Sequence, residues 1–163
     1  MDTLYTSLDK IIYAKDAVNI MSEYDFTKHI PYYDNDDTNC SYKKILFYKS
    51  SKYDIYFIFW NPYSETLFHN HSENGCVMKI LYGQLVEERL SKKDNIINQT
   101  IMNQNCVSYI ENISAIHKIK EIKGMSALSV HIYFPGGFKT TYYNCLNSTS
   151  SDGGVTVTSS VGI

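Results

Sequence analysis

The stretch that does most to define this chain is His69-Asn70-His71-Ser72-Glu73-Asn74-Gly75-Cys76, followed by an apolar run that ends at Gly83. Side chains alternate between the two faces of an extended strand, so His69 and His71 project from the same face and can offer imidazole nitrogens to one metal ion. Asn74-Gly75 is a turn signal, and a second strand follows it. The stretch therefore predicts a metal-binding pair of strands; two histidines facing a polar interior without a metal are the alternative.

Short β-prone runs continue on both sides of this stretch. The expected strands are 45–49, 53–60, 65–71, 76–82, 84–90, 96–102, 106–110, 117–122, 127–134, 140–145 and 155–159. Turn residues separate them, at Asn61-Pro62, Gly83, Lys93-Asp94-Asn95, Lys123-Gly124 and Pro135-Gly136-Gly137. Many short strands at such intervals are typical of an antiparallel sandwich or a jelly-roll barrel.

The N-terminal part differs in texture. Apolar residues recur at roughly helical spacing between residues 4 and 24, which predicts one or two amphipathic helices, and Pro31–Asn39 is a polar loop. We expect one domain over residues 1–163, with helices and loop in 1–40 and the barrel in 41–163. The Ser/Gly-rich stretch 148–154 is interpreted as a loop before the last strand.

Composition limits the class of partner. The 163 residues can bury one sizeable core, and the formal charge of −2 with scattered lysines favours neither nucleic acid nor an anionic membrane. Cys40, Cys76, Cys106 and Cys145 form no C-x-x-C pair, which argues against a structural zinc site. The N-terminus has no signal-peptide pattern, and no apolar run is long enough to cross a bilayer. We therefore expect a cytoplasmic monomer with reduced thiols and a small-molecule partner.

The spacing H-x-H-x4-C-x6-G resembles the first motif of the cupin barrels, which usually carry glutamate where this chain has Cys76. His117, on a strand of the second half, is the candidate third ligand. Further local matches carry a resemblance to the cysteine dioxygenase family over most of the chain: 79–88, 105–112, 129–133, 155–158 and 162–163. The resemblance implies a mainly β, cupin-type antiparallel jelly-roll barrel with short N-terminal helices.

The same resemblance implies the chemistry of the site. His69, His71 and His117 would hold one Fe(II) per chain. Both atoms of O2 would pass to the sulfur of L-cysteine, giving cysteine sulfinic acid. Three neutral imidazoles without a carboxylate suit this reaction, because a substrate thiolate supplies the missing negative charge.

The resemblance also assigns residues beside the metal. Ser129, His131 and Tyr133 would form a hydrogen-bonded row with catalytic roles, since alternate residues of one strand face the same side. Cys76 would lie close enough to Tyr133 for a thioether crosslink. The alternatives are a small buried core residue for Cys76 and a structural histidine for His117 or His131.

The chain departs from the family pattern at the substrate carboxylate. Animal members bind it with an arginine two residues after a tyrosine on an early strand. Tyr48 resembles that tyrosine, but Lys49 and Ser50 follow it, and the only arginine of the chain is Arg89. Tyr48, Lys49 and Ser50 are therefore the predicted substrate contacts, with Lys49 or Lys52 as a point charge.

The missing arginine leaves alternatives open. The substrate could be another small thiol, such as cysteamine, 3-mercaptopropionate or an N-terminal cysteine. A metal-binding cupin without catalysis is the second class of function.

Overall fold

The computed structural model of this chain describes residues 3–33, 41–146 and 156–160. Short helices come first: α1 (Thr3–Leu8), η1 (Ala14–Ala17), α2 (Val18–Glu23) and η2 (Phe26–His29). The strands are β1 (Tyr42–Lys49), β2 (Asp54–Trp60), β3 (Phe68–His69), β4 (Cys76–Tyr82), β5 (Gln84–Ser91), β6 (Ile97–Asn103), β7 (Val107–Ile110), β8 (Ala115–Lys120), β9 (Ala127–Tyr133), β10 (Tyr142–Leu146) and β11 (Thr156–Ser160).

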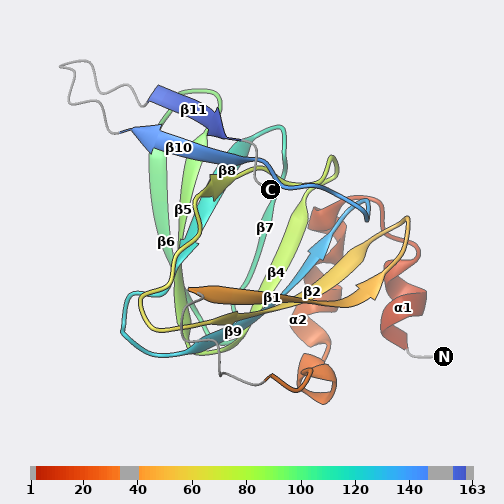
Figure 1. Cartoon of the computed structure of the whole chain (residues 1–163). Coiled ribbons are helices and arrows are strands. Elements are labelled where there is room, and N and C mark those ends of the chain that lie inside the picture. Colours follow the sequence, from red (N-terminus) through yellow and green to blue (C-terminus); the bar gives the residue numbers. More distant parts are fainter. Residues whose placement is uncertain (1–2, 34–40, 147–155, 161–163) are drawn as a thin grey trace.

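The strands form two antiparallel sheets that enclose an interior (Figure 1). Over the described residues, the first sheet has the order β1-β2-β9-β4-β7 and the second the order β11-β10-β3-β8-β5-β6. Neighbours in a sheet are often far apart in sequence, as expected when the chain passes repeatedly between two facing sheets. The predicted jelly-roll barrel with short N-terminal helices is confirmed.

The core has two main parts, one on each face of the first sheet. The helices cover the outer face, where Leu4, Leu8, Met21, Phe26, Phe57 and Val130 are buried together. Inside the barrel, the first sheet packs against the second through Ile58, Trp60, Met78, Ile80, Leu85, Met102 and Ile119. Strand β2 is therefore covered on both faces, which explains why its sequence is a continuous apolar run with little alternation.

Lys79 joins the helical layer to the sheet. It is buried in β4, and its ammonium donates hydrogen bonds of 3.0 Å to the carbonyl oxygens of Ser22 and Tyr24. These carbonyls lie at the end of α2, where backbone acceptors lack helical partners and favour a cation. The ammonium thus anchors α2 against the sheet.

A tight turn connects the two histidines of the H-x-H stretch to β4. Gly75 has φ +94°, and a Cβ there would lie 2.5 Å from the carbonyl oxygen of Ile110. A side chain at this position is excluded by both the backbone conformation and the close approach of Ile110. The turn brings Cys76 into register with Tyr133 of β9, and β3 pairs with β8 at His69 and His117.

Some boundaries differ from the sequence-based expectation. Strand β3 is only two residues long, where a strand over 65–71 was expected, because Asn70 onward leaves the sheet toward the turn. Strand β1 begins at Tyr42 instead of residue 45, and β8 begins at Ala115 instead of residue 117. The expected loop 148–154 and most of the loop 31–39 lie outside the described residues. The single-domain assignment of 1–163 stays a prediction. No helix among the described residues is both long and apolar enough to span a membrane.

Candidate metal centre

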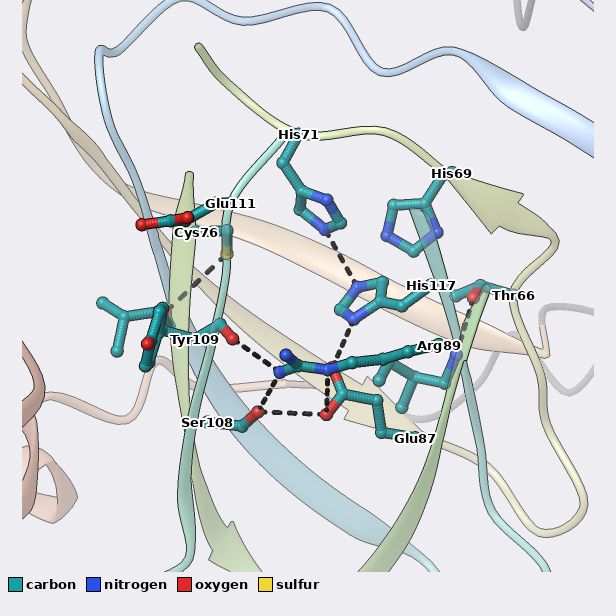
Figure 2. Close-up of polar contacts among 12 residues, drawn as sticks. Thr66, His69, His71, Cys76, Glu87, Arg89, Ser108, Tyr109, Glu111 and His117 are labelled. Atoms are coloured by element: carbon teal, nitrogen blue, oxygen red, sulfur yellow. Dashed lines mark hydrogen bonds and ion pairs between the residues drawn. The ribbon is translucent and has the colours of Figure 1, made fainter. Parts of the chain in front are cut away.

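Three histidine side chains converge inside the barrel. His69 lies at the end of β3, His71 just after it, and His117 in the paired strand β8; all three are buried. Figure 2 shows their rings turned toward one another. The nitrogens that they offer lie within 4.8 Å of one another, and the Nε2 atoms of His71 and His117 are 2.9 Å apart. Three imidazole nitrogens gathered this closely are a donor set that one divalent metal ion can share.

The remaining ring nitrogens orient two of the three imidazoles. His69 Nδ1 is 2.9 Å from the carbonyl oxygen of Leu67 and can donate a hydrogen bond to it. His117 Nδ1 is 2.6 Å from Glu87 Oε1. His71 Nδ1 is buried without a hydrogen-bond partner in the described part of the chain. His69 and His117 can therefore present Nε2 to a shared ion, as is usual in metal-binding proteins, and the Nε2 of His71 faces that of His117.

The electrostatics suit a divalent metal. Burial lowers the pKa of His69 from 6.5 to about 4, and lowers the pKa values of His71 and His117 well below 6.5. All three imidazoles are neutral at neutral pH, the form that binds metal. The potential metal-binding group found in the described residues holds these histidines and no carboxylate. A bound divalent ion would keep its full positive charge and attract an anionic ligand.

The buried histidines predict a pH-dependent stability of the metal-free protein. Burial also lowers the pKa of His131 to about 3. These histidines take up protons on unfolding below their ordinary pKa, so their stabilising contribution is complete above about pH 6.5 and is lost as the pH falls toward about 4 and 3. Urea unfolding across this range should give a free energy of unfolding that decreases with falling pH. The slope should be smaller in His131→Gln by up to about one proton; an unchanged slope would contradict the assignment.

A chain of polar contacts runs along β9 beside the histidines. Trp60 Nε1 donates to Ser129 Oγ at 2.9 Å, and Ser129 Oγ lies 2.9 Å from His131 Nε2. Because Ser129 accepts from Trp60, its hydroxyl hydrogen is free to be donated to His131. The Tyr133 ring lies beside His131, with centroids 6.3 Å apart. Trp60 was not anticipated as a member of this row.

Tyr133 also adjoins the metal-binding group and Cys76. Its ring is nearly parallel to that of His71, with centroids 6.4 Å apart. Cys76 and Tyr133 are directly opposite in the pairing of β4 and β9 and share one buried cluster. Side chains at such positions have Cβ atoms about 4.5–5.5 Å apart. Burial raises the pKa of the Cys76 thiol to about 12, so Cys76 is protonated at neutral pH.

The predicted substrate contacts are corrected by the structure, which brings none of them to the histidines. Tyr48 packs between the rings of Tyr5 and Tyr53, with centroid distances of 4.8 and 5.4 Å, in the core under the helices. Lys49 is exposed, and Ser50 Oγ donates to the Tyr53 carbonyl oxygen at 2.9 Å. A β-bulge between Leu46 and Tyr48 explains the error, since it turns Tyr48 to the outer face.

Lys44 is the cation that enters the interior instead. Its ammonium lies 4.1 Å from the ring centroid of Tyr56 and 4.3 Å from that of Tyr133. The residue is exposed as a whole, since β1 is an edge strand, but burial around the ammonium lowers its pKa. Lys52, the other candidate point charge, instead donates to the carbonyl oxygen of Asp9 at 3.0 Å.

A sequence signal for Lys44 was present. Tyr42-Lys43-Lys44 repeats the family spacing of a tyrosine followed two residues later by a cation. Tyr42 stacks obliquely on Trp60 with centroids 5.2 Å apart, next to the Ser129 row. At Tyr48, by contrast, the residue two positions later is Ser50, which carries no charge.

Comparisons with known proteins identify a family model and several relatives that match this chain. The family model "Cysteine dioxygenase type I" matches residues 8–144. Cysteine dioxygenase type 1 of Danio rerio is 23% identical over 94 residues, which are 53% of this chain and 47% of that protein. The Bos taurus protein of the same name is 26% identical over 93 residues, 53% of this chain and 46% of that protein. The chain thus spans about half the length of these relatives.

Solved structures support the fold alone. An oxalate oxidase aligns with a TM-score of 0.60 and 13% identity, covering 82% of this chain and 71% of the other. The Cnp3 cupin domain of Schizosaccharomyces pombe aligns with a TM-score of 0.51 and 12% identity, covering 59% and 66% of the two chains. The cupin-type fold is confirmed, and the family match over most of the sequence shows that this chain belongs to the cysteine dioxygenase type I family.

Proposed function

We propose that this protein is an iron-dependent thiol dioxygenase that oxidises L-cysteine to cysteine sulfinic acid. The observation that carries the proposal is a group of three neutral histidines without a carboxylate, next to a tyrosine whose ring contacts a lysine ammonium. Family membership supports the same reaction. Ferrous iron held by His69, His71 and His117 would supply the electrons that let O2 react with a thiolate.

The residues around the histidines have separate tasks in this proposal. The Lys44 ammonium binds the substrate carboxylate as a single charge, and its contacts with Tyr56 and Tyr133 fix where the ammonium lies. The Tyr133 hydroxyl donates a hydrogen bond to the substrate. The hydrogen bonds from Trp60 through Ser129 hold the ring of His131, which lies beside Tyr133, in position. Cys76 is protonated until any crosslink forms, so it does not compete with the substrate thiolate for the metal.

Lys44 also ranks the possible substrates. An ammonium held beside the rings of Tyr56 and Tyr133 attracts thiols that carry a carboxylate, which cysteine and 3-mercaptopropionate have and cysteamine lacks. 3-Mercaptopropionate is therefore the second candidate substrate. A cytoplasmic location and a monomeric state stay predictions from the sequence.

A panel of thiols tests the proposed substrate. Iron-loaded protein would be supplied separately with cysteine, 3-mercaptopropionate and cysteamine, and the sulfinic acid products measured by mass spectrometry. We expect kcat/KM to be highest for cysteine and lowest for cysteamine. Faster oxidation of cysteamine than of cysteine would contradict the assignment of a carboxylate-bearing substrate.

The opposed positions of Cys76 and Tyr133 predict a thioether that forms during turnover. The Cys76 S–H bond and a ring C–H bond of Tyr133 are broken, an S–C bond forms, and O2 accepts the two electrons and two protons. Mass spectrometry should detect the loss of two hydrogen atoms, together with a faster-migrating gel band. Cys76→Ser should abolish both signals and keep iron binding, whereas Cys106→Ser, at a free cysteine elsewhere in the barrel, should keep both. An alkylatable Cys76 in every molecule after prolonged turnover would contradict the prediction.

A further inference from the structure

A hydrogen-bonded network lies behind His117, on the side away from the other two histidines (Figure 2). Glu87 of β5 is buried, and its Oε1 is 2.6 Å from His117 Nδ1. Its other oxygen, Oε2, lies 3.0 Å from Arg89 Nε and accepts a 3.0 Å hydrogen bond from Ser108 Oγ. Both carboxylate oxygens of Glu87 are therefore engaged.

Arg89 extends this network to the opposite sheet. Its Nη2 donates to Ser108 Oγ at 2.7 Å and to the Tyr109 carbonyl oxygen at 2.5 Å. Ser108 and Tyr109 belong to β7 of the first sheet, whereas Arg89 lies on β5 of the second. One guanidinium thus holds three acceptors on two sheets, which its planar fork of donors permits and a lysine ammonium would not match. This use accounts for the only arginine in the sequence.

We propose that Arg89 and Ser108 fix the Glu87 carboxylate, and that Glu87 in turn sets the tautomer and orientation of His117 as a metal ligand. All three are positioning residues, and the proposal rests on the metal site proposed above. A carboxylate at Nδ1 keeps the proton on that nitrogen, so Nε2 carries the lone pair. Because Arg89 and Ser108 hold Oε2, the Glu87 carboxylate has one orientation. The His117 ring that it contacts through Oε1 is then held in one orientation as well.

The backbone supports the same role. Arg89 and His117 are directly paired in the register of β5 and β8, so the residue that clamps Glu87 is also the strand neighbour of the ligand. Glu87 and Arg89 are two residues apart and face the same side of β5. The intervening Glu88 points the other way and makes ion pairs with Lys118 at 3.3 Å and Lys120 at 2.5 Å. Glu88 is therefore a matched control on the same strand.

Cobalt(II) titration of the metal-free protein tests the proposal without using activity. We expect Glu87→Gln to weaken Co(II) binding by about 10–100-fold and to shift the ligand-field bands, because Gln has no charge to hold the Nδ1 proton and turns an amide toward Arg89. Arg89→Lys and Ser108→Ala should weaken binding less, by up to about tenfold. Glu88→Gln should leave both affinity and spectrum at the parent values. If the Glu87–Arg89–Ser108 network only stabilised the two sheets, these variants would have a lower melting temperature but the parent Co(II) spectrum.

The outcomes separate this proposal from the metal site itself. Parent-like Co(II) affinity and spectrum in folded Glu87→Gln would overturn the positioning role. Should Glu87→Gln fail to fold, Arg89→Lys and Ser108→Ala decide, and parent-like binding in both would overturn it equally. If the parent protein bound no Co(II), or if His117→Ala bound it as the parent does, the proposed metal site would be wrong instead.

Discussion

Replacing His69, His71 or His117 by alanine is expected to abolish iron binding and dioxygenase activity together. Each change removes one of three neutral nitrogen donors, and no carboxylate in the described metal-binding group can take its place. Changes to residues that only support a ligand already cost about 10–100-fold in metal affinity, so loss of a ligand should cost more. Iron content after anaerobic loading and rates of O2 uptake measure the two effects.

The remaining histidines supply the controls. His131→Gln changes a buried histidine on β9 outside the metal-binding group, and it should keep iron while activity falls. His29→Ala changes a histidine that contacts Tyr24 in the helical layer, and it should keep both. Iron at the parent level in all three ligand variants would contradict the assignment.

Lys44→Met is expected to raise KM for cysteine by roughly 10–150-fold, with a smaller change in kcat. A hydrogen bond to a charged group contributes about 1.5–3 kcal/mol, and each 1.4 kcal/mol is about tenfold in affinity. Cysteamine has no carboxylate, so its kcat/KM should be nearly unchanged. Lys44→Arg should improve kcat/KM for cysteine by about tenfold, because a guanidinium offers two aligned donors where an ammonium offers one strongly hydrated charge.

Lys43→Met is the matched control for this prediction. Lys43 immediately precedes Lys44 on β1 and points to the opposite face, where its ammonium lies 5.0 Å from the ring centroid of Tyr33. The Lys43→Met variant should have the same kcat and KM as the parent protein with both cysteine and cysteamine. Equal losses for cysteine and cysteamine in Lys44→Met would show that Lys44 supports the barrel and does not bind the carboxylate.

The sequence was sufficient where local patterns determine the structure. Because side chains alternate along a strand, His69 and His71 are predicted to share one face, and the residues 129, 131 and 133 another. A few strand pairings then bring these two faces together. The apolar runs and turn residues between them predicted the barrel. Strand β3 is shorter than the sequence predicts. The H-x-H spacing suggests a strand through His71, but the two histidines converge even though the strand ends at His69.

The sequence was not sufficient to predict which face of the sheet a side chain occupies where one irregularity interrupts the alternation along a strand. From Lys44, strict alternation would turn Tyr48 inward as well, but the β-bulge between Leu46 and Tyr48 turns it outward. The network of Glu87, Arg89 and Ser108 depends on contacts between strands that are about twenty to thirty residues apart, which no local spacing encodes.

Oxygen uptake by the anaerobically iron-loaded protein tests the central claim most directly. On addition of L-cysteine and isotopically labelled O2, we expect rapid uptake and cysteine sulfinic acid that carries both atoms from one O2 molecule, with neither in His117→Ala. If the loaded protein held its iron but consumed no O2 with cysteine or with 3-mercaptopropionate, it would be a metal-binding cupin without this catalysis, and the proposed function would be wrong.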